Sequence, residues 1–211
     1  MGTEPVTGVL LAGGLSRRMG GGDKGLLPLA GKAMLGHVID RLAPQVDKLI
    51  INANGDPDRF RPFGLPVVAD TVAGFVGPLA GVLAGMRWAL AHAPTHRVLV
   101  TAPGDAPLLP RDLVARLSAA VADGGGPIAL ARSAGELHPV IGLWPVALAA
   151  DLEAQLAQGV RKVLAWTDRH GTVAVDFPPA RLAGREVDPF FNANTPQDLD
   201  TLRGLLADPG A

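Results

Sequence analysis

A glycine-rich stretch with three basic side chains is the first part of the sequence that could do chemistry. Arg17, Arg18 and Lys24 lie in LAGGLSRRMGGGDKG, which follows a short apolar run ending at Leu11. Glycines leave backbone N–H groups open to close approach by a phosphate or a base edge. We expect Lys24 to close over a polyphosphate; the alternative is a solvated loop whose basic residues face water.

A single carboxylate, Asp105, stands out in the segment TAPGDAPLLP, just after an apolar run ending at Thr101. Carboxylate oxygens are ligands that Mg²⁺ prefers, and such an ion could bridge to phosphate oxygens. The alternative is an aspartate that caps a helix. We expect Pro110 to be the first residue of that helix, which would leave Asp105 several residues too early to cap it.

Two asparagines precede the last helical pattern, in FFNANTPQDL. Thr195 is the natural N-cap of a helix that starts at Pro196. Asn194 could supply a second oxygen to a metal, whereas Asn192 would order the turn. Asparagines before a helix are also common turn formers, so this second interpretation stays open.

The pattern of apolar residues predicts strands and helices in alternation. Val6–Leu11 is typical of a buried parallel strand, and 34–42 repeats its apolar residues at helical spacing. Strand, loop, helix and strand in repetition indicate an α/β fold, a mostly parallel sheet with helices on both faces. The other predicted strands are 48–51, 66–69, 97–101, 128–131 and 140–143, and the other predicted helices are 78–92, 110–121, 146–156, 160–167 and 196–206.

The candidate residues follow the predicted strands at their carboxyl ends. Ligands of open α/β sheets bind at that edge. The rule selects the loop after Leu11, Asn52, Asp70 and the loop after Thr101. These four places are therefore expected to meet in one site.

Composition limits the class of protein. With 211 residues and 48% hydrophobic content, the chain suits one globular domain. The net charge of −1 argues against nucleic-acid binding, and the lack of cysteine removes thiol chemistry and disulfides. No basic leader or apolar run of membrane-spanning length is seen, so we expect a soluble, cytoplasmic protein with no membrane partner.

Several familiar motifs fail. Lys32 follows a glycine but precedes Ala33, so the Walker A sequence is incomplete. The glycines of GGGDKG match GxGxxG only formally, since they neither follow the strand directly nor open a helix. No GxSxG is present. His92 and His96 have the spacing of metal ligands, but Pro94 lies between them, and we expect both in a surface loop.

Taken together, these motifs resemble the molybdenum cofactor guanylyltransferases, the MobA family. The resemblance extends over nearly the whole chain, in family order, and departs from the family pattern at Ala33 and Ala106, where proline and threonine are usual. The segments that carry it are LLAGGLSRRMGGGDKGLLPLAGKAML, LIINAN, VVADTVAGFVGPLAG, TAPGDAPLLP, ELHPVIGLW and FFNANTPQDL.

The resemblance implies a single Rossmann-like nucleotidyltransferase domain over residues 1–211. Residues 1 to about 125 would bind the nucleotide, and the remainder would face the pterin substrate. The implied reaction uses GTP and Mg²⁺ to join GMP to the terminal phosphate of molybdopterin carrying molybdenum, with release of pyrophosphate. Other cofactor-synthesis proteins or chaperones of acceptor molybdoenzymes are the implied protein partners.

The resemblance also implies roles for individual residues. The guanine and phosphates would lie on Leu11, Ala12, Gly13 and Gly14, and Lys24 would contact the phosphates. Asn52 and Asp70 would hold the nucleoside, and Gly81 would shape the wall of the site. Asp105 would bind Mg²⁺ together with Asn194. Arg18, Lys24 and Asp105 would be the catalytic set. Arg161 and Lys162 could receive the pterin phosphate, with Asn192 nearby, although an exposed helix face would explain the two basic residues equally well.

Two rival functions remain. One is a sister nucleotidyltransferase that uses CTP on the same pterin or a nucleotide on a sugar phosphate; the glycine at Gly14 favours the guanylyl branch, because cytidylyl relatives typically have LAAG. The other is a non-catalytic nucleotide-binding module, against which Lys24 and Asp105 argue.

Overall fold

A seven-stranded sheet forms the centre of the part of the chain that the computed structural model describes, residues 4–13, 23–72 and 77–206. The strand order is β5-β4-β1-β6-β8-β7-β9. Neighbouring strands are parallel except that β8 runs antiparallel to both β6 and β7, so the sheet is mostly parallel, as predicted. The strands are β1 Val6–Leu11, β4 Lys48–Asn52, β5 Val67–Val68, β6 Val98–Pro103, β7 Ile128–Ser133, β8 Glu136–Pro145 and β9 Thr172–Asp176.

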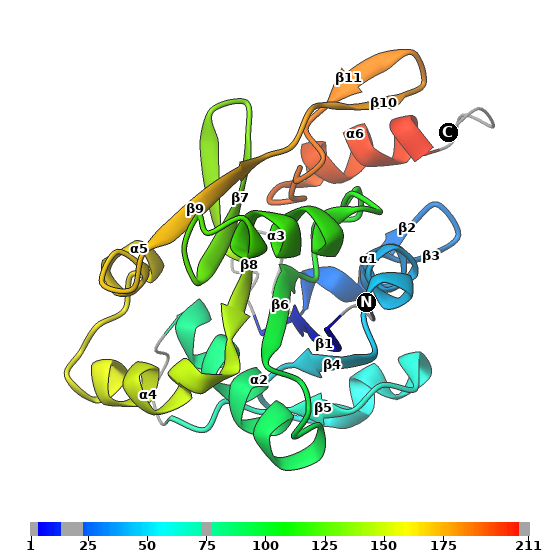
Figure 1. The fold of residues 1–211 in the computed structure, drawn as a ribbon. Coiled ribbons are helices and arrows are strands. Elements are labelled where there is room, and N and C mark those ends of the chain that lie inside the picture. The colour runs from blue at the N-terminus through cyan, green and yellow to red at the C-terminus, as the bar shows by residue number, and fades with distance from the viewer. Residues whose placement is uncertain (1–3, 14–22, 73–76, 207–211) are drawn as a thin grey trace.

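Helices cover both faces of this sheet (Figure 1). Successive side chains of a strand point to opposite faces. Leu10 of β1 accordingly packs in one core with α1 and α3, while its neighbour Val9 packs in a second core with α2, α4 and α5. The helices are α1 Met34–Leu42, α2 Pro78–His92, α3 Leu113–Ala122, α4 Ala149–Ala157, α5 Val163–Thr167 and α6 Pro196–Leu206.

A third core lies under the last helix. Leu202 of α6 is buried with Leu29 and Met34, which belong to the segment around the hairpin of β2 (Pro28–Leu29) and β3 (Lys32–Ala33). A second hairpin, β10 (Ala180–Leu182) and β11 (Arg185–Val187), lies beside α6 at the top of Figure 1. This core joins the C-terminal helix to the segment that follows the glycine-rich loop.

Four elements have the predicted bounds: β1, α1, α2 and α6. The prediction that a helix starts at Pro110 is wrong, because α3 starts at Leu113. The Arg41 guanidinium donates to the carbonyl of Leu109, and the Gln45 amide donates to that of Pro110 at 2.9 Å. Side chains of the neighbouring segment therefore hold residues 109–110 outside the helix.

The C-terminal part of the sheet differs most from the prediction. Strand β9 and both hairpins were not predicted, and β8 is longer than the predicted 140–143. The expectation of a surface loop is wrong for His96, which is buried with its Nδ1 2.8 Å from the Thr7 hydroxyl. Within the described ranges, no helix has the length and apolar character needed to cross a membrane.

Candidate active site

One cavity opens at the carboxyl ends of β1, β4 and β6, where the sequence placed a site. It encloses about 340 Å³, and its walls come from all four of the predicted places. The lining residues are Leu11, Ala12, Gly13, Lys24, Gly25, Asn52, Asn54, Asp70, Gly77, Pro78, Pro103, Gly104, Asp105 and Val140.

A charged group occupies one side of the cavity. The Lys24 ammonium lies 3.8 Å from Asp105 Oδ2 and donates to Asn194 Oδ1 at 2.7 Å. Lys24 and Asp105 are about one-fifth exposed, at 20% and 21%. Burial raises the pKa of the Asp105 carboxyl above its usual value, and the Lys24 ammonium offsets only part of that rise. The structure therefore brings together three residues that are up to 170 positions apart in the sequence.

Helix α6 positions Asn194 through its N-terminal cap. Thr195 is the N-cap, as predicted, because its hydroxyl accepts the N–H of Asp198 at 3.1 Å. The Asp198 carboxylate in turn accepts the N–H groups of Thr195 at 2.8 Å and Asn194 at 2.9 Å. This reciprocal arrangement is a capping box, and it holds the backbone of Asn194 beside Lys24.

Polar side chains from β4 and the loop after β5 line the opposite side. Asn52 Nδ2 donates to Asp70 Oδ1 at 3.0 Å and to the carbonyl of Val68 at 3.1 Å. Asn54 Nδ2 donates to Asp70 Oδ2 at 2.7 Å, and Asn54 Oδ1 accepts the Asp70 N–H at 2.9 Å. Both carboxylate oxygens of Asp70 are thus held in place, which fixes the orientation of the group.

Two glycines permit this close packing. A Cβ on Gly81 of α2 would lie 2.3 Å from Asn52 Oδ1 and 2.6 Å from Leu11 Cδ2, so only glycine fits behind Asn52. A Cβ on Gly25 would lie 3.1 Å from the carbonyl of Gly104. Gly81 therefore supports the wall from behind and does not itself line the cavity.

The remaining candidates are Gly14, Arg18, Arg161, Lys162 and Asn192. Gly14 and Arg18 fall outside the described residues. The Arg161 guanidinium donates to the carbonyls of Leu156 and Val160, at the end of α4, and Lys162 is exposed directly before α5. Neither basic side chain lines the cavity.

Asn192 is next in sequence to a residue that contacts the backbone of Asp105. Its neighbour Ala193 donates to the carbonyl of Asp105 at 3.2 Å. The Oδ1 atom of Asn192 is buried and has no hydrogen-bond partner among the described residues. An unpaired buried acceptor of this kind is uncommon and calls for a donor.

A partly buried polar cluster contacts the same C-terminal segment at residues 188 and 190. The Ser133 hydroxyl donates to Asp188 Oδ1 at 2.7 Å and lies 2.6 Å from His138 Nε2. The N–H of Phe190 also donates to Asp188, at 2.9 Å, and the Phe190 ring packs on the imidazole. Burial lowers the pKa of His138, and the carboxylates of Asp188 and Glu136 counteract it in part.

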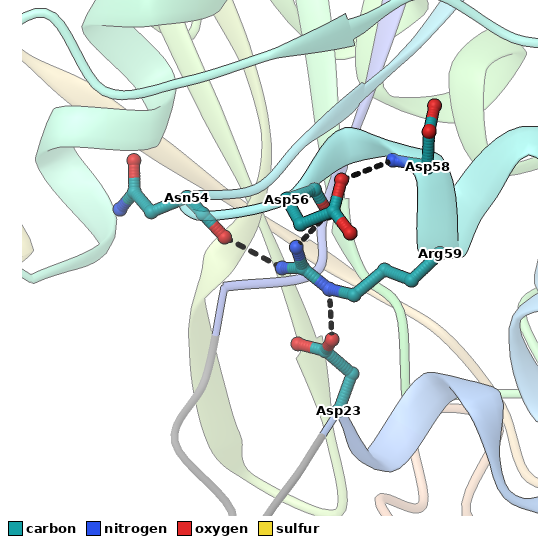
Figure 2. Close-up of polar contacts among 5 residues, drawn as sticks. All are labelled: Asp23, Asn54, Asp56, Asp58 and Arg59. Carbon is teal, nitrogen blue, oxygen red and sulfur yellow. Dashed lines mark hydrogen bonds and ion pairs between the residues drawn. The ribbon is translucent and has the colours of Figure 1, made fainter.

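Sequence reasoning missed Asn54, Arg59 and Asp23, whose contacts Figure 2 shows. Asn54 has a signal: it follows Asn52 by two residues, so both project to the same side of an extended chain. The contact between Arg59 and Asp23 joins positions 36 apart, and nothing in the local pattern of either segment indicates it.

Known proteins resemble this chain in sequence. The MobA-like NTP transferase domain model matches residues 8–173. A molybdenum cofactor guanylyltransferase from Bradyrhizobium sp. (strain ORS 278) is 52% identical over 206 residues, covering 97% of this chain and 95% of that protein. Another from Rhodopseudomonas palustris (strain BisB5) is 55% identical over 201 residues, with coverage of 94% and 93%.

A solved structure shares the fold. Molybdopterin-guanine dinucleotide biosynthesis protein A from Archaeoglobus fulgidus superposes with a TM-score of 0.72 at 22% identity, covering 96% of this chain and 98% of that one. This likeness shows that the fold is shared, whereas the two relatives with more than 50% identity show the family. The chain belongs to the MobA-like NTP transferase family, and within it to the molybdenum cofactor guanylyltransferases.

Proposed function

We propose that GTP binds in the cavity at the carboxyl edge of the sheet and donates GMP to molybdopterin carrying molybdenum. The observation that carries this proposal is that one cavity has an oriented carboxylate, Asp70, on one side and a cation, Lys24, on the other. The nucleoside would lie on the side of Asn52 and Asp70, and the phosphates on the side of Gly13 and Lys24.

The donor atoms beside Lys24 suit Mg²⁺, the metal that the family resemblance implies. Asp105 and Asn194 both present oxygen, which Mg²⁺ prefers. Among the described residues, no cluster of three His, Cys, Asp or Glu side chains could enclose a metal by itself. This donor set suits an ion held by one carboxylate and substrate phosphates, and bound Mg²⁺ would neutralise charge on the triphosphate.

The transfer needs positioning and charge neutralisation more than proton transfer. An oxygen of the terminal pterin phosphate attacks the α-phosphorus of GTP and forms the new P–O bond. The bond between that phosphorus and the α,β-bridging oxygen breaks, and pyrophosphate leaves. A phosphomonoester is largely ionised at pH 7, since its second pKa is about 6, so no general base is required. Lys24 and Arg18 would balance the charge on the phosphates.

The acceptor would approach from the C-terminal part of the chain. The contact of Ala193 with Asp105 and the unpaired Oδ1 of Asn192 support this direction. We assign Asn192, Arg161 and Lys162 to the pterin side, and residues 126–211 to that half of a single domain. The cytoplasmic location and the protein partners stay predictions.

Product analysis tests the proposal. The protein is incubated with Mg²⁺, molybdenum-loaded molybdopterin and either GTP or CTP. We expect the guanine dinucleotide and pyrophosphate with GTP, and preferential use of CTP would overturn the guanylyl assignment. Asp105→Asn should lower kcat by about 10²-fold or more, because a neutral amide holds the metal poorly. Asp123→Asn, an exposed carboxylate, is the matched control, and near-normal Mg²⁺-dependent turnover by Asp105→Asn would refute its role.

A further inference from the structure

Arg59 belongs to the 3-10 helix Pro57–Phe63, which follows β4. Asp56 caps this helix by accepting the Asp58 N–H at 3.0 Å. The Arg59 guanidinium lies 4.6 Å from the ring centroid of Phe60, which is fully buried and anchors the helix. The guanidinium head of Arg59 is therefore stacked on a buried ring in addition to its polar contacts.

All three nitrogens of the Arg59 guanidinium are bonded (Figure 2). Nη2 donates to the carbonyl of Asn54 at 2.6 Å, Nη1 donates to the carbonyl of Asp56, and Nε donates to Asp23. The side chain of Arg59 is 26% exposed and that of Asp23 is 15% exposed, so the ion pair is largely shielded from water. A planar fork with several donors suits this task, whereas the compact ammonium of a lysine lacks that fork geometry.

Asp23 is the residue immediately before Lys24. Its carbonyl accepts the N–H of Leu26 at 3.0 Å and starts the 3-10 helix Lys24–Leu26. Its carboxylate makes no hydrogen bond to that helix and is bonded to Arg59 instead. Arg59 thereby fixes the point from which the lysine side chain leaves the backbone.

On the other side, Arg59 holds Asn54. The backbone carbonyl of Asn54 accepts from Arg59, while its side chain makes two hydrogen bonds with Asp70. A continuous bonded path therefore runs from Asp70 through Asn54, Arg59 and Asp23 to Lys24. Both ends of this path line the same cavity.

We propose that Arg59 is a positioning residue, which sets the placement of the phosphate-binding lysine relative to the nucleoside-binding carboxylate. The inference rests on the proposed placement of GTP. A nucleotide that must reach both Asp70 and Lys24 binds best when their separation is fixed beforehand. Loss of Arg59 therefore weakens GTP binding and leaves the acceptor side unaffected.

Arg59→Met tests the inference, with Arg61→Met in the same helix as the matched control, because Arg61 is exposed. The Kd for GTP is measured by calorimetry with Mg²⁺ and without pterin, and KM is measured for both substrates. We expect Arg59→Met to weaken GTP binding about tenfold, with KM for molybdopterin unchanged. Arg59→Lys should fall between the parent and Arg59→Met.

A double-mutant cycle isolates the ion pair. If Arg59 acts through Asp23, then Asp23→Asn weakens GTP binding, and adding Arg59→Met costs less than it does in the parent. Asp23→Asn and Arg59→Lys carry the test if Arg59→Met does not fold, as judged by thermal melting. GTP binding by these variants within about twofold of the parent would overturn the inference.

The outcomes separate this inference from the proposed function. A parent protein that makes the guanine dinucleotide, with Arg59 variants that bind GTP normally, overturns only the role of Arg59. A parent that binds GTP without forming product overturns the proposed reaction, and the Kd values still decide the inference. A parent that binds no GTP overturns both.

Discussion

Burial and the neighbouring Lys24 have opposite effects on the pKa of Asp105. The carboxyl is mostly buried, which favours its neutral form, and the nearby ammonium favours the charged form that a metal needs. Burial has the larger effect, so the pKa of Asp105 stays raised. A charged carboxylate at this position therefore lowers stability, and its proposed role in the reaction would explain why it is kept.

Asp105→Asn should be more stable than the parent at neutral pH. The folded-state pKa of Asp105 lies above its unfolded value of about 3.9, so the folded protein binds more protons between the two values, and stability falls as pH rises through that window. Asp105→Asn removes this loss and should raise Tm at pH 7, by an amount that shrinks at low pH. Thermal melts of the parent, Asp105→Asn and Asp123→Asn across pH check this, and a Tm at or below that of the parent at pH 7 would contradict it.

At the scale of elements, two helices hold the two sides of the cavity. The capping box of α6 holds Asn194, and the N-terminal turns of α2 pack Gly81 against Asn52. Burial alone would raise the pKa of Asp198, but hydrogen bonds from Thr195 and Asn194 lower it overall. Its stabilising effect is therefore present above the unfolded pKa and is lost as pH falls through the folded one.

Thr195→Ala should destabilise the protein by about 1 kcal/mol, because it removes the N-cap acceptor of α6. Thr201→Ala is the matched control, since its hydroxyl bonds only to the carbonyl one turn earlier, within the same helix. Urea unfolding measures both. Equal losses in the free energy of unfolding for the two substitutions would show that the N-cap hydrogen bond adds no stability.

Gly81→Ala and Gly204→Ala should have opposite signs. A methyl group at Gly81 meets Asn52 and Leu11 well inside contact distance, so we expect a loss of about 1–3 kcal/mol and weaker GTP binding. Around Gly204 in α6 the space is open, so alanine should stabilise the helix by up to about 1 kcal/mol. The free energies of unfolding of the two variants and of the parent test both signs. A Gly81→Ala protein as stable as the parent and with normal GTP affinity would contradict the close packing of Gly81 against Asn52 and Leu11.

At the scale of the whole molecule, the proposed sites for the two substrates lie toward the two ends of one sheet. The parallel strands β5, β4, β1 and β6 lead into the residues that line the cavity proposed for GTP, whereas β8, β7 and β9 continue the sheet toward the segment that carries Asn192. β8 joins the halves, because Val140 lines the cavity and the Ser133 cluster holds residue 188.

Substitutions in the two halves should affect different substrates. Asn52→Ala should raise KM for GTP about tenfold by releasing Asp70, with little change for molybdopterin. Arg161→Met should do the reverse, and Arg185→Met, an exposed arginine of β11, is its control. Steady-state kinetics with each substrate varied in turn give the KM of each variant for GTP and for molybdopterin. A rise in KM for GTP with Arg161→Met would place that residue on the nucleotide side.

The parts that the sequence predicted are those set by short-range patterns. Hydrophobic spacing and flanking prolines determine β1, α1 and α2, and the edge rule of parallel sheets brought Lys24 and Asp105 together correctly. The antiparallel β8 and the strand β9 depend on pairing between distant segments, which no local periodicity encodes. Arg59 was missed for the same reason: its function depends on a partner 36 residues away, and an isolated arginine in a polar segment reads as surface.

The capping box of α6 also has a consequence for the order in which the site forms during synthesis of the chain. Lys24 receives its amide partner from residue 194, and that residue is fixed only once the first turn of the last helix has formed. Contacts between such distant positions are slow to close, because the intervening chain loses much conformational freedom. A chain emerging from the ribosome can form the side of the cavity with Asn52 and Asp70 early, but the side with Lys24 is completed only when translation has passed α6. Messages truncated before that point therefore give proteins without a finished site.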